Sequence, residues 1–139
     1  MIICHGNTRK GHGRNSVMLI EEDLTYKIRG CVFEVFRELG AGFLEKVYEN
    51  SLVVELEKKG LNCKAQHVLT VNYKGNIVGE YIADLLVEDK VIIELKSVNK
   101  ILPVHEAQIL NYLKATNIEL GLLVNFSHPK ATVKRYVFN

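Results

Sequence analysis

The spacing of apolar residues along the chain divides its first half into two predicted helices. From about Glu22 to Leu39 the apolar residues lie three and four positions apart, which predicts an amphipathic helix ended by Gly40-Ala41-Gly42. A second helix is predicted from about residue 44 to residue 59, with Gly60 as its end. Beyond Gly60 the spacing of apolar residues changes to two, which is the period of a β-strand.

The second half of the chain is predicted to form a three-strand meander, one helix and two further strands. The strands are expected at 64–73, 77–87, 91–98, 119–126 and 132–138, and the helix from Pro103 to about Ala115, ended by Asn117. Segment 119–126 is largely apolar, which predicts a strand buried on both faces. The order helix, helix, three strands, helix, two strands predicts an α+β fold with a mixed sheet flanked by helices.

Length and composition indicate a single domain. The chain has 139 residues, of which 47% are hydrophobic, enough for one sizeable core. Residues 1–17 have little apolar content, so we expect a flexible N-terminal arm followed by a domain over residues 18–139. Three widely spaced cysteines favour neither a disulfide framework nor a zinc site. With no apolar signal core or membrane-spanning run, we expect a cytoplasmic protein.

The net charge of +2 is unevenly distributed. Residues 1–17 and residues 120–139 each carry three basic residues and no acid, whereas residues 21–59 hold nine acids against six bases, so the body of the chain is nearly neutral. This distribution does not indicate non-specific nucleic-acid binding by bulk charge, but it leaves room for local basic patches.

Three charged residues stand out because they lie inside two otherwise apolar predicted strands. Asp84 lies in the second strand, and Glu94 and Lys96 lie in the third. Alternation places these three side chains on one face. The opposite, apolar face is predicted to hold Ala83, Leu85, Val87, Val91, Ile93 and Leu95. If the hairpin closes symmetrically about Asp89, Asp84 lies opposite Glu94 with ~5 Å between their Cβ atoms.

Two carboxylates at so short a distance from each other on a mostly apolar surface require either a proton or a cation between them. A hard divalent ion such as Mg²⁺, held by a few carboxylates and water, fits that arrangement. Lys96 would then direct its ammonium group toward whatever the ion binds. The competing interpretation is a solvated sheet face with a Glu–Lys pair, because the bare spacing of these residues is common.

Two further features favour a functional site, although each has an ordinary explanation. His105, Gln108 and Tyr112 form a narrow polar stripe on the helix after the third strand, which could meet the carboxylates or face solvent. Glu45, within Gly42–Tyr48, lies in the first turn of the second helix, where the helix dipole alone favours an acid.

With these residues considered together, the chain resembles a GxxExxY protein, a group within the PD-(D/E)XK nuclease superfamily. Gly42, Glu45 and Tyr48 match the naming motif, Asp84, Glu94 and Lys96 match the acidic–acidic–lysine core, and Gln108 to Tyr112 match a QxxxY element. Ala83 stands where the superfamily has the proline of its name. The resemblance covers residues 18–139 and implies the restriction-endonuclease-like α-β-β-β-α-β core.

The resemblance implies a metal-dependent nuclease that hydrolyses phosphodiester bonds of DNA. Asp84, Glu94 and the backbone carbonyl of Leu95 would ligate Mg²⁺ or Mn²⁺. Glu45 would approach the same ion from the second helix, directly or through water.

The resemblance also implies roles for the remaining motif residues. Lys96 would orient or deprotonate the attacking water and offset charge in the transition state. Gln108 and Tyr112 would position Lys96 and the scissile phosphate. We include His105 and Tyr48 as further candidates for positioning the substrate.

A catalytically silent nucleic-acid-binding or scaffold module of the same fold is the alternative to an enzyme. The small, nearly neutral body motivates this alternative. It predicts that the protein binds DNA without cleaving it, and that the binding is lost at high salt. In either case a domain of this size has little surface to grip a duplex, so we expect a homodimer.

Overall fold

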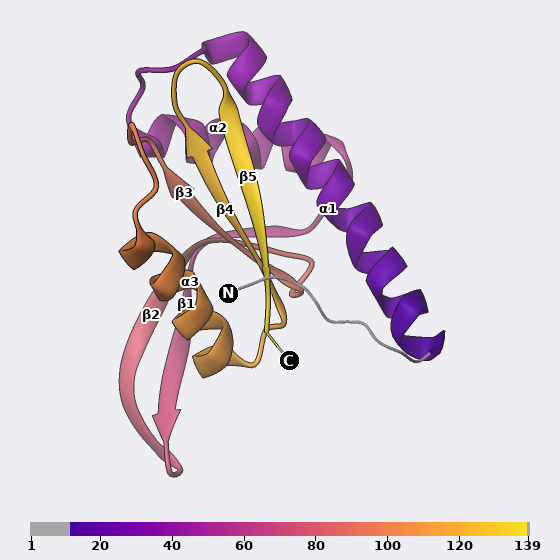
Figure 1. The fold of residues 1–139 in the computed structure, drawn as a ribbon, viewed down its shortest axis with the longest axis vertical. Helices are drawn as coiled ribbons and strands as arrows, with labels where there is room; N and C mark the ends of the chain where they lie inside the picture. Colours follow the sequence, from indigo (N-terminus) through magenta and orange to yellow (C-terminus); the bar gives the residue numbers. More distant parts are fainter. Residues whose placement is uncertain (1–11, 139) are drawn as a thin grey trace.

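The computed structural model describes the backbone of residues 12–138 and the side chains of residues 22–138. Its elements are α1 (His12–Leu39), α2 (Glu45–Lys58), β1 (Cys63–Tyr73), β2 (Asn76–Val87), β3 (Val91–Lys96), α3 (Pro103–Thr116), β4 (Leu120–Phe126) and β5 (Ala131–Val137), as shown in Figure 1. The predicted order of helices and strands is therefore confirmed. Asn117 ends α3 in the left-handed conformation, with φ of 61°.

The largest boundary difference concerns α1, which begins at His12 rather than at about Glu22. Residues 12–17, predicted as part of the arm, are therefore helical, whereas residues 1–11 lie outside the described residues. Residues 12–16 contain no large apolar side chain and residues 17–20 are apolar without interruption, so neither stretch shows the three- and four-residue spacing of an amphipathic helix. No helix in the described part of the chain combines the length and the apolar content needed to cross a membrane.

The five strands form one mixed sheet in the order β1-β2-β3-β4-β5. β3 and β4 are parallel and are joined through α3, and the other neighbouring pairs are antiparallel. The helices α1 and α2 cover one face of the sheet, and α3 covers the other (Figure 1). β4 is buried along its whole length, as its apolar sequence predicts.

The hairpin of β1 and β2 exchanges its two faces partway along its length. Leu85 packs on the α1–α2 side of the sheet, whereas Ala83 packs on the α3 side, although regular alternation would place them together. The β1–β2 ladder skips Gln66 and Asp84 at this step, and Gln66 has a φ of 52°. The prediction that Ala83 shares a face with Leu85 is therefore wrong, because it assumed an unbroken strand.

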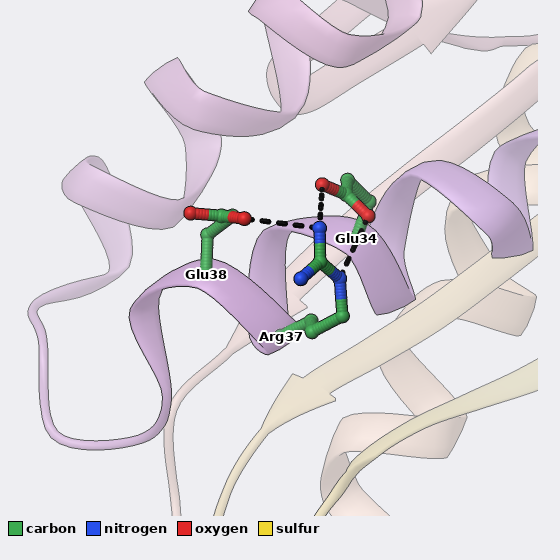
Figure 2. Close-up of polar contacts among 3 residues, drawn as sticks. All are labelled: Glu34, Arg37 and Glu38. Atoms are coloured by element: carbon green, nitrogen blue, oxygen red, sulfur yellow. Dashed lines mark hydrogen bonds and ion pairs between the residues drawn. The ribbon is translucent and has the colours of Figure 1, made fainter.

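The last turn of α1 carries an exposed ion-pair network (Figure 2). Arg37 donates from Nε and Nη2 to the two carboxylate oxygens of Glu34, at 3.1 and 2.7 Å, and Nη2 lies 3.0 Å from Glu38 Oε2. These hydrogen bonds hold the pKa of Glu34 below its usual range. Because all three side chains are exposed, the network adds little to the stability of the fold.

The position of α3 over the sheet depends on a close approach at Gly121 in β4. A Cβ atom there would lie 3.0 Å from Ile109 Cδ1 and 3.3 Å from Leu113 Cδ2. Ile109 and Leu113 are the completely buried residues of α3, so the helix rests directly on the β4 backbone. The absence of a side chain at Gly121 therefore sets the height of α3 above the sheet.

We predict that Gly121→Ala destabilises the protein by about 1–3 kcal/mol, because the added methyl group overpacks the contact with α3. Gly79→Ala is the matched control, since Gly79 also lies in a strand but an added Cβ atom there would meet no other atom within 4 Å. We expect the control to change stability by no more than about 0.5 kcal/mol. Urea unfolding measures both variants, and equal unfolding midpoints would contradict the prediction.

Candidate functional site

The candidate site lies where β2 and β3 separate. The ladder pairs Val87 with Val91, Leu86 with Ile92 and Leu85 with Ile93, which is the register predicted from a turn about Asp89. The β2–β3 ladder ends at the pair of Leu85 and Ile93. Beyond this pair β3 stays bonded to β4 alone, while the β1–β2 hairpin bends away (Figure 1).

Asp84 turns its carboxylate into this gap between the strands. Its Oδ2 accepts a hydrogen bond of 2.8 Å from the backbone N–H of Leu95. Backbone N–H groups lie in the plane of a sheet. The Asp84 side chain therefore points into the opening between β2 and β3, rather than standing on the face covered by α3 as the alternation predicted.

Glu94 lies beside Asp84 and points toward α3. Its Oε2 accepts hydrogen bonds from the hydroxyl of Tyr81 and, at 3.4 Å, from the backbone N–H of Asp84. Burial, followed by the negative charge of Asp84, raises the pKa of Glu94 to about 7. The predicted adjacency of the two acids is thus confirmed, and it carries an electrostatic cost.

The pKa of Asp84 is also raised, mainly because its carboxylate is partly buried. The Leu95 N–H opposes this shift by stabilising the charged form, whereas the negative charge of Glu49 adds to it. Glu49, on α2, is thus a third acid close to Asp84.

Glu49 is held in place by two partners. Its side chain is buried, with 4% of the residue exposed. Its Oε1 accepts a hydrogen bond of 2.7 Å from Gln66 Nε2, and its Oε2 lies 3.0 Å from Lys46 Nζ. The amide of Gln66 also lowers the pKa of Asp84, which lies opposite it in the hairpin. Gln66 therefore connects α2 to the gap between β2 and β3.

Lys96 completes the group of charges, and its positive charge lowers the pKa of both Asp84 and Glu94. Among the described residues, no carboxylate lies within ion-pair distance of its ammonium group. The Lys96 ammonium is therefore available to an anionic ligand.

The chain after Lys96 is firmly attached to its neighbours. Asn125, 4% exposed, accepts a 3.0 Å hydrogen bond from the Val98 N–H and donates a 2.9 Å hydrogen bond to the Val98 carbonyl. Ser97 Oγ donates to the carbonyl of Phe43, at 3.1 Å, just before α2. These bonds fix the end of β3 against β4 and the start of α2.

Of the polar stripe predicted on α3, one residue lies against the site. The ring of Tyr112 stacks on Tyr81, with centroids 3.4 Å apart, and burial and the charge of Glu94 raise its pKa. Gln108 is exposed and forms no hydrogen bond with the described acids. His105 Nδ1 accepts a 3.0 Å hydrogen bond from the Leu102 N–H, so His105 caps the start of α3.

The two predicted residues of α2 also differ in their surroundings. Glu45 is the first residue of α2 and is exposed, and no hydrogen bond or ion pair joins it to the described acids of the site. Tyr48 is completely buried, and its hydroxyl donates to the Gly40 carbonyl at 2.5 Å. Its ring stacks on Phe126 at 4.2 Å. Tyr48 therefore holds the α1–α2 connection, and a substrate-positioning role does not fit its burial.

Four residues of this region were missed by reasoning from the sequence. Two of them carried a detectable signal: Glu49 follows Glu45 by four positions, hence on the same helix face, and Asn125 is a polar residue in an otherwise apolar strand. Tyr81 and Gln66 carried none, because their contacts depend on the exchange of faces within the hairpin.

The donor atoms in the gap fit a hard divalent cation. The N–H and C=O of one strand residue point to the same edge, so the Leu95 carbonyl faces the gap together with its N–H. With Asp84 and Glu94 it offers oxygen ligands of the kind that Mg²⁺ takes alongside water. The described residues contain no cluster of three or more His, Cys, Asp or Glu side chains arranged to hold a metal.

Comparisons with known proteins agree with the fold. A family profile described as the PD-(D/E)XK nuclease superfamily matches residues 22–136. No curated protein gives a significant match. The crystal structure of SSO0001 is similar in fold, with a TM-score of 0.52 and 21% sequence identity over 66% of this chain. The chain covers 48% of the length of that protein, and the likeness concerns the fold alone.

We predict that the metal-free protein loses stability as the pH rises from about 4.5 to about 7. The pKa of Glu94 is raised from 4.5 to about 7 in the folded state. Its contribution to the free energy of unfolding is therefore fully present below pH 4.5 and is lost as the pH rises through 7. Glu94→Gln removes this contribution, on the order of 1–3 kcal/mol. Urea unfolding in EDTA between pH 4.5 and 8 measures it, and identical pH profiles for the variant and the parent would contradict it.

Proposed function

This chain belongs to the PD-(D/E)XK nuclease superfamily, and from that premise we propose that it is a metal-dependent nuclease that hydrolyses phosphodiester bonds of DNA. The observation that carries the proposal is the convergence of Asp84, Glu94 and Lys96 at the gap between β2 and β3. Two acids with raised pKa values, beside a lysine that no carboxylate of the described residues pairs with, form a site suited to a cation and a phosphate.

Asp84, Glu94 and the Leu95 carbonyl are the proposed ligands of Mg²⁺ or Mn²⁺. When bound, such an ion polarises a phosphoryl oxygen and lowers the pKa of a coordinated water molecule. The Leu95 N–H and the Tyr81 hydroxyl already hold one oxygen of each acid, which orients both carboxylates before any ion arrives.

Lys96 is the proposed partner of the phosphate. Its ammonium is a compact charge that can point at one oxygen, orient the attacking water and offset charge in the transition state. Tyr112 lies on α3, close to Glu94 of β3. It is the second proposed contact for the substrate, in addition to Lys96. Gln108 stays a proposed positioning residue one helical turn away on the exposed surface of α3.

The finer assignments are part of the same proposal. We assign the chain to the GxxExxY group on Gly42, Glu45 and Tyr48, and Gly42 has a φ of 105°, which a side chain would strain. The thiols of Cys31 and Cys63 are both free, as expected in the cytoplasm. A homodimer stays a prediction from the small surface that one domain offers to a duplex.

We predict that Lys96→Ala and Asp84→Asn each lower DNA cleavage by about 10²–10³-fold, because each removes charge from the site of phosphoryl transfer. Lys114→Ala is the control, since Lys114 is an exposed lysine of α3. Labelled linear, circular and single-stranded DNA, incubated with Mg²⁺ or Mn²⁺ and with EDTA, supply the measurement.

The outcome of the cleavage assay separates the enzyme from the silent module. Cleavage that survives both variants would contradict the assigned site. Salt-sensitive binding of DNA without cleavage by the parent protein would favour the catalytically silent nucleic-acid-binding module.

A separate prediction concerns which acid of α2 serves the site. The resemblance points to Glu45, whereas the charge of Glu49 is the one that acts on Asp84. We expect Glu49→Gln to weaken Mn²⁺ binding more than Glu45→Gln, and isothermal titration calorimetry measures both. A larger loss for Glu45→Gln would restore Glu45 as the α2 ligand.

A further inference from the structure

Gln66 has a backbone conformation that the sequence of β1 does not explain. Its φ of 52° lies in the left-handed region, although it is neither a glycine nor part of a turn. A residue with a side chain persists in that region only where its surroundings compensate for a strain on the order of 1–3 kcal/mol. Its neighbours in β1 pair regularly with β2 on either side.

The side chain of Gln66 makes contacts that account for this conformation. Its Nε2 donates a 2.7 Å hydrogen bond to Glu49 Oε1. Gln66 also lies opposite Asp84 where the β1–β2 ladder is interrupted, and its amide lowers the pKa of that acid. An amide nitrogen carries two hydrogens and can therefore serve two carboxylates at once. Gln66 is thus placed between an acid of the sheet and an acid of α2.

A neutral amide suits this position better than a charged group. The negative charges of Glu49 and Asp84 disfavour each other, and two N–H donors reduce that cost without altering the net charge. A lysine would neutralise the acids and compete with a cation, whereas a glutamate would add a third negative charge. The amide therefore adds no charge to a site in which Lys46 already lies 3.0 Å from Glu49.

We propose that Gln66 is a positioning residue that orients Asp84 and Glu49 and thereby sets the affinity of the site for a divalent cation. This inference rests on the proposed function as a metal-dependent nuclease. Gln66 acts through the two acids and does not itself contact the ion or the substrate.

The test is a comparison of Mn²⁺ affinities, measured without DNA by isothermal titration calorimetry. Gln66→Gly removes the amide but accepts the left-handed conformation, so the relief of backbone strain offsets the lost hydrogen bond to Glu49 and we expect the variant to stay folded in urea unfolding. We expect its Mn²⁺ dissociation constant to rise by about 10–100-fold, as for other residues that orient metal ligands. Asn72→Ala, which removes an exposed amide from the same strand, should leave the affinity unchanged.

A parent-like Mn²⁺ affinity in a folded Gln66→Gly variant would overturn the inference while leaving the proposed function intact. Failure of the parent protein itself to bind Mn²⁺ would instead overturn the proposed function.

A kinetic measurement separates positioning from a direct catalytic role. We expect the cleavage deficit of Gln66→Gly to disappear at saturating Mn²⁺, because only the affinity for the ion is reduced. The deficit of Lys96→Ala should persist under the same conditions. A kcat deficit of Gln66→Gly that persists at saturating Mn²⁺ would also overturn the inference.

Discussion

An antiparallel strand pair that exchanges its two faces in one step leaves a residue of each strand outside the regular ladder, and in β1 and β2 these residues are Gln66 and Asp84. Asp84 belongs to neither face of the sheet, so its carboxylate can enter the gap that opens beside β3 and take the Leu95 N–H. Gln66, opposite Asp84, reaches the acid of α2. The arrangement of the candidate site follows from this single irregularity, together with the early end of the β2–β3 ladder.

The exchange of faces concentrates negative charge where water is partly excluded. Burial raises the pKa of both Glu94 and Asp84, and the charge of Asp84 adds to the shift of Glu94 while that of Glu49 adds to the shift of Asp84. The Tyr81 hydroxyl, the Leu95 N–H and the Gln66 amide offset only part of that cost. A group of buried acids whose electrostatic cost is only partly offset is typical of a functional site. The electrostatic cost singles out this region within a chain that belongs to a nuclease superfamily.

The sequence predicted the order of elements and the β2–β3 register because apolar spacing and the turn about Asp89 determine both. It also predicted that Asp84 and Glu94 are neighbours. It failed where a residue departs from its regular conformation: Ala83 was assigned to the wrong face, and nothing in the residue type of Gln66 indicates a positive φ. Pattern reasoning also cannot separate polar residues used for structure, as His105 and Tyr48 are, from those facing a ligand.

The amide of Asn125, bonded to both backbone groups of Val98, has a consequence for how such a domain can vary. Because this amide closes onto the backbone just beyond Lys96, the end of β3 is tied to β4 independently of the connection that leads to α3. Residues 99 and 100 of that connection are exposed, whereas Ile101 packs against the α3 side of the core. Sequence drift is therefore tolerated more readily at residues 99 and 100 than at Ile101.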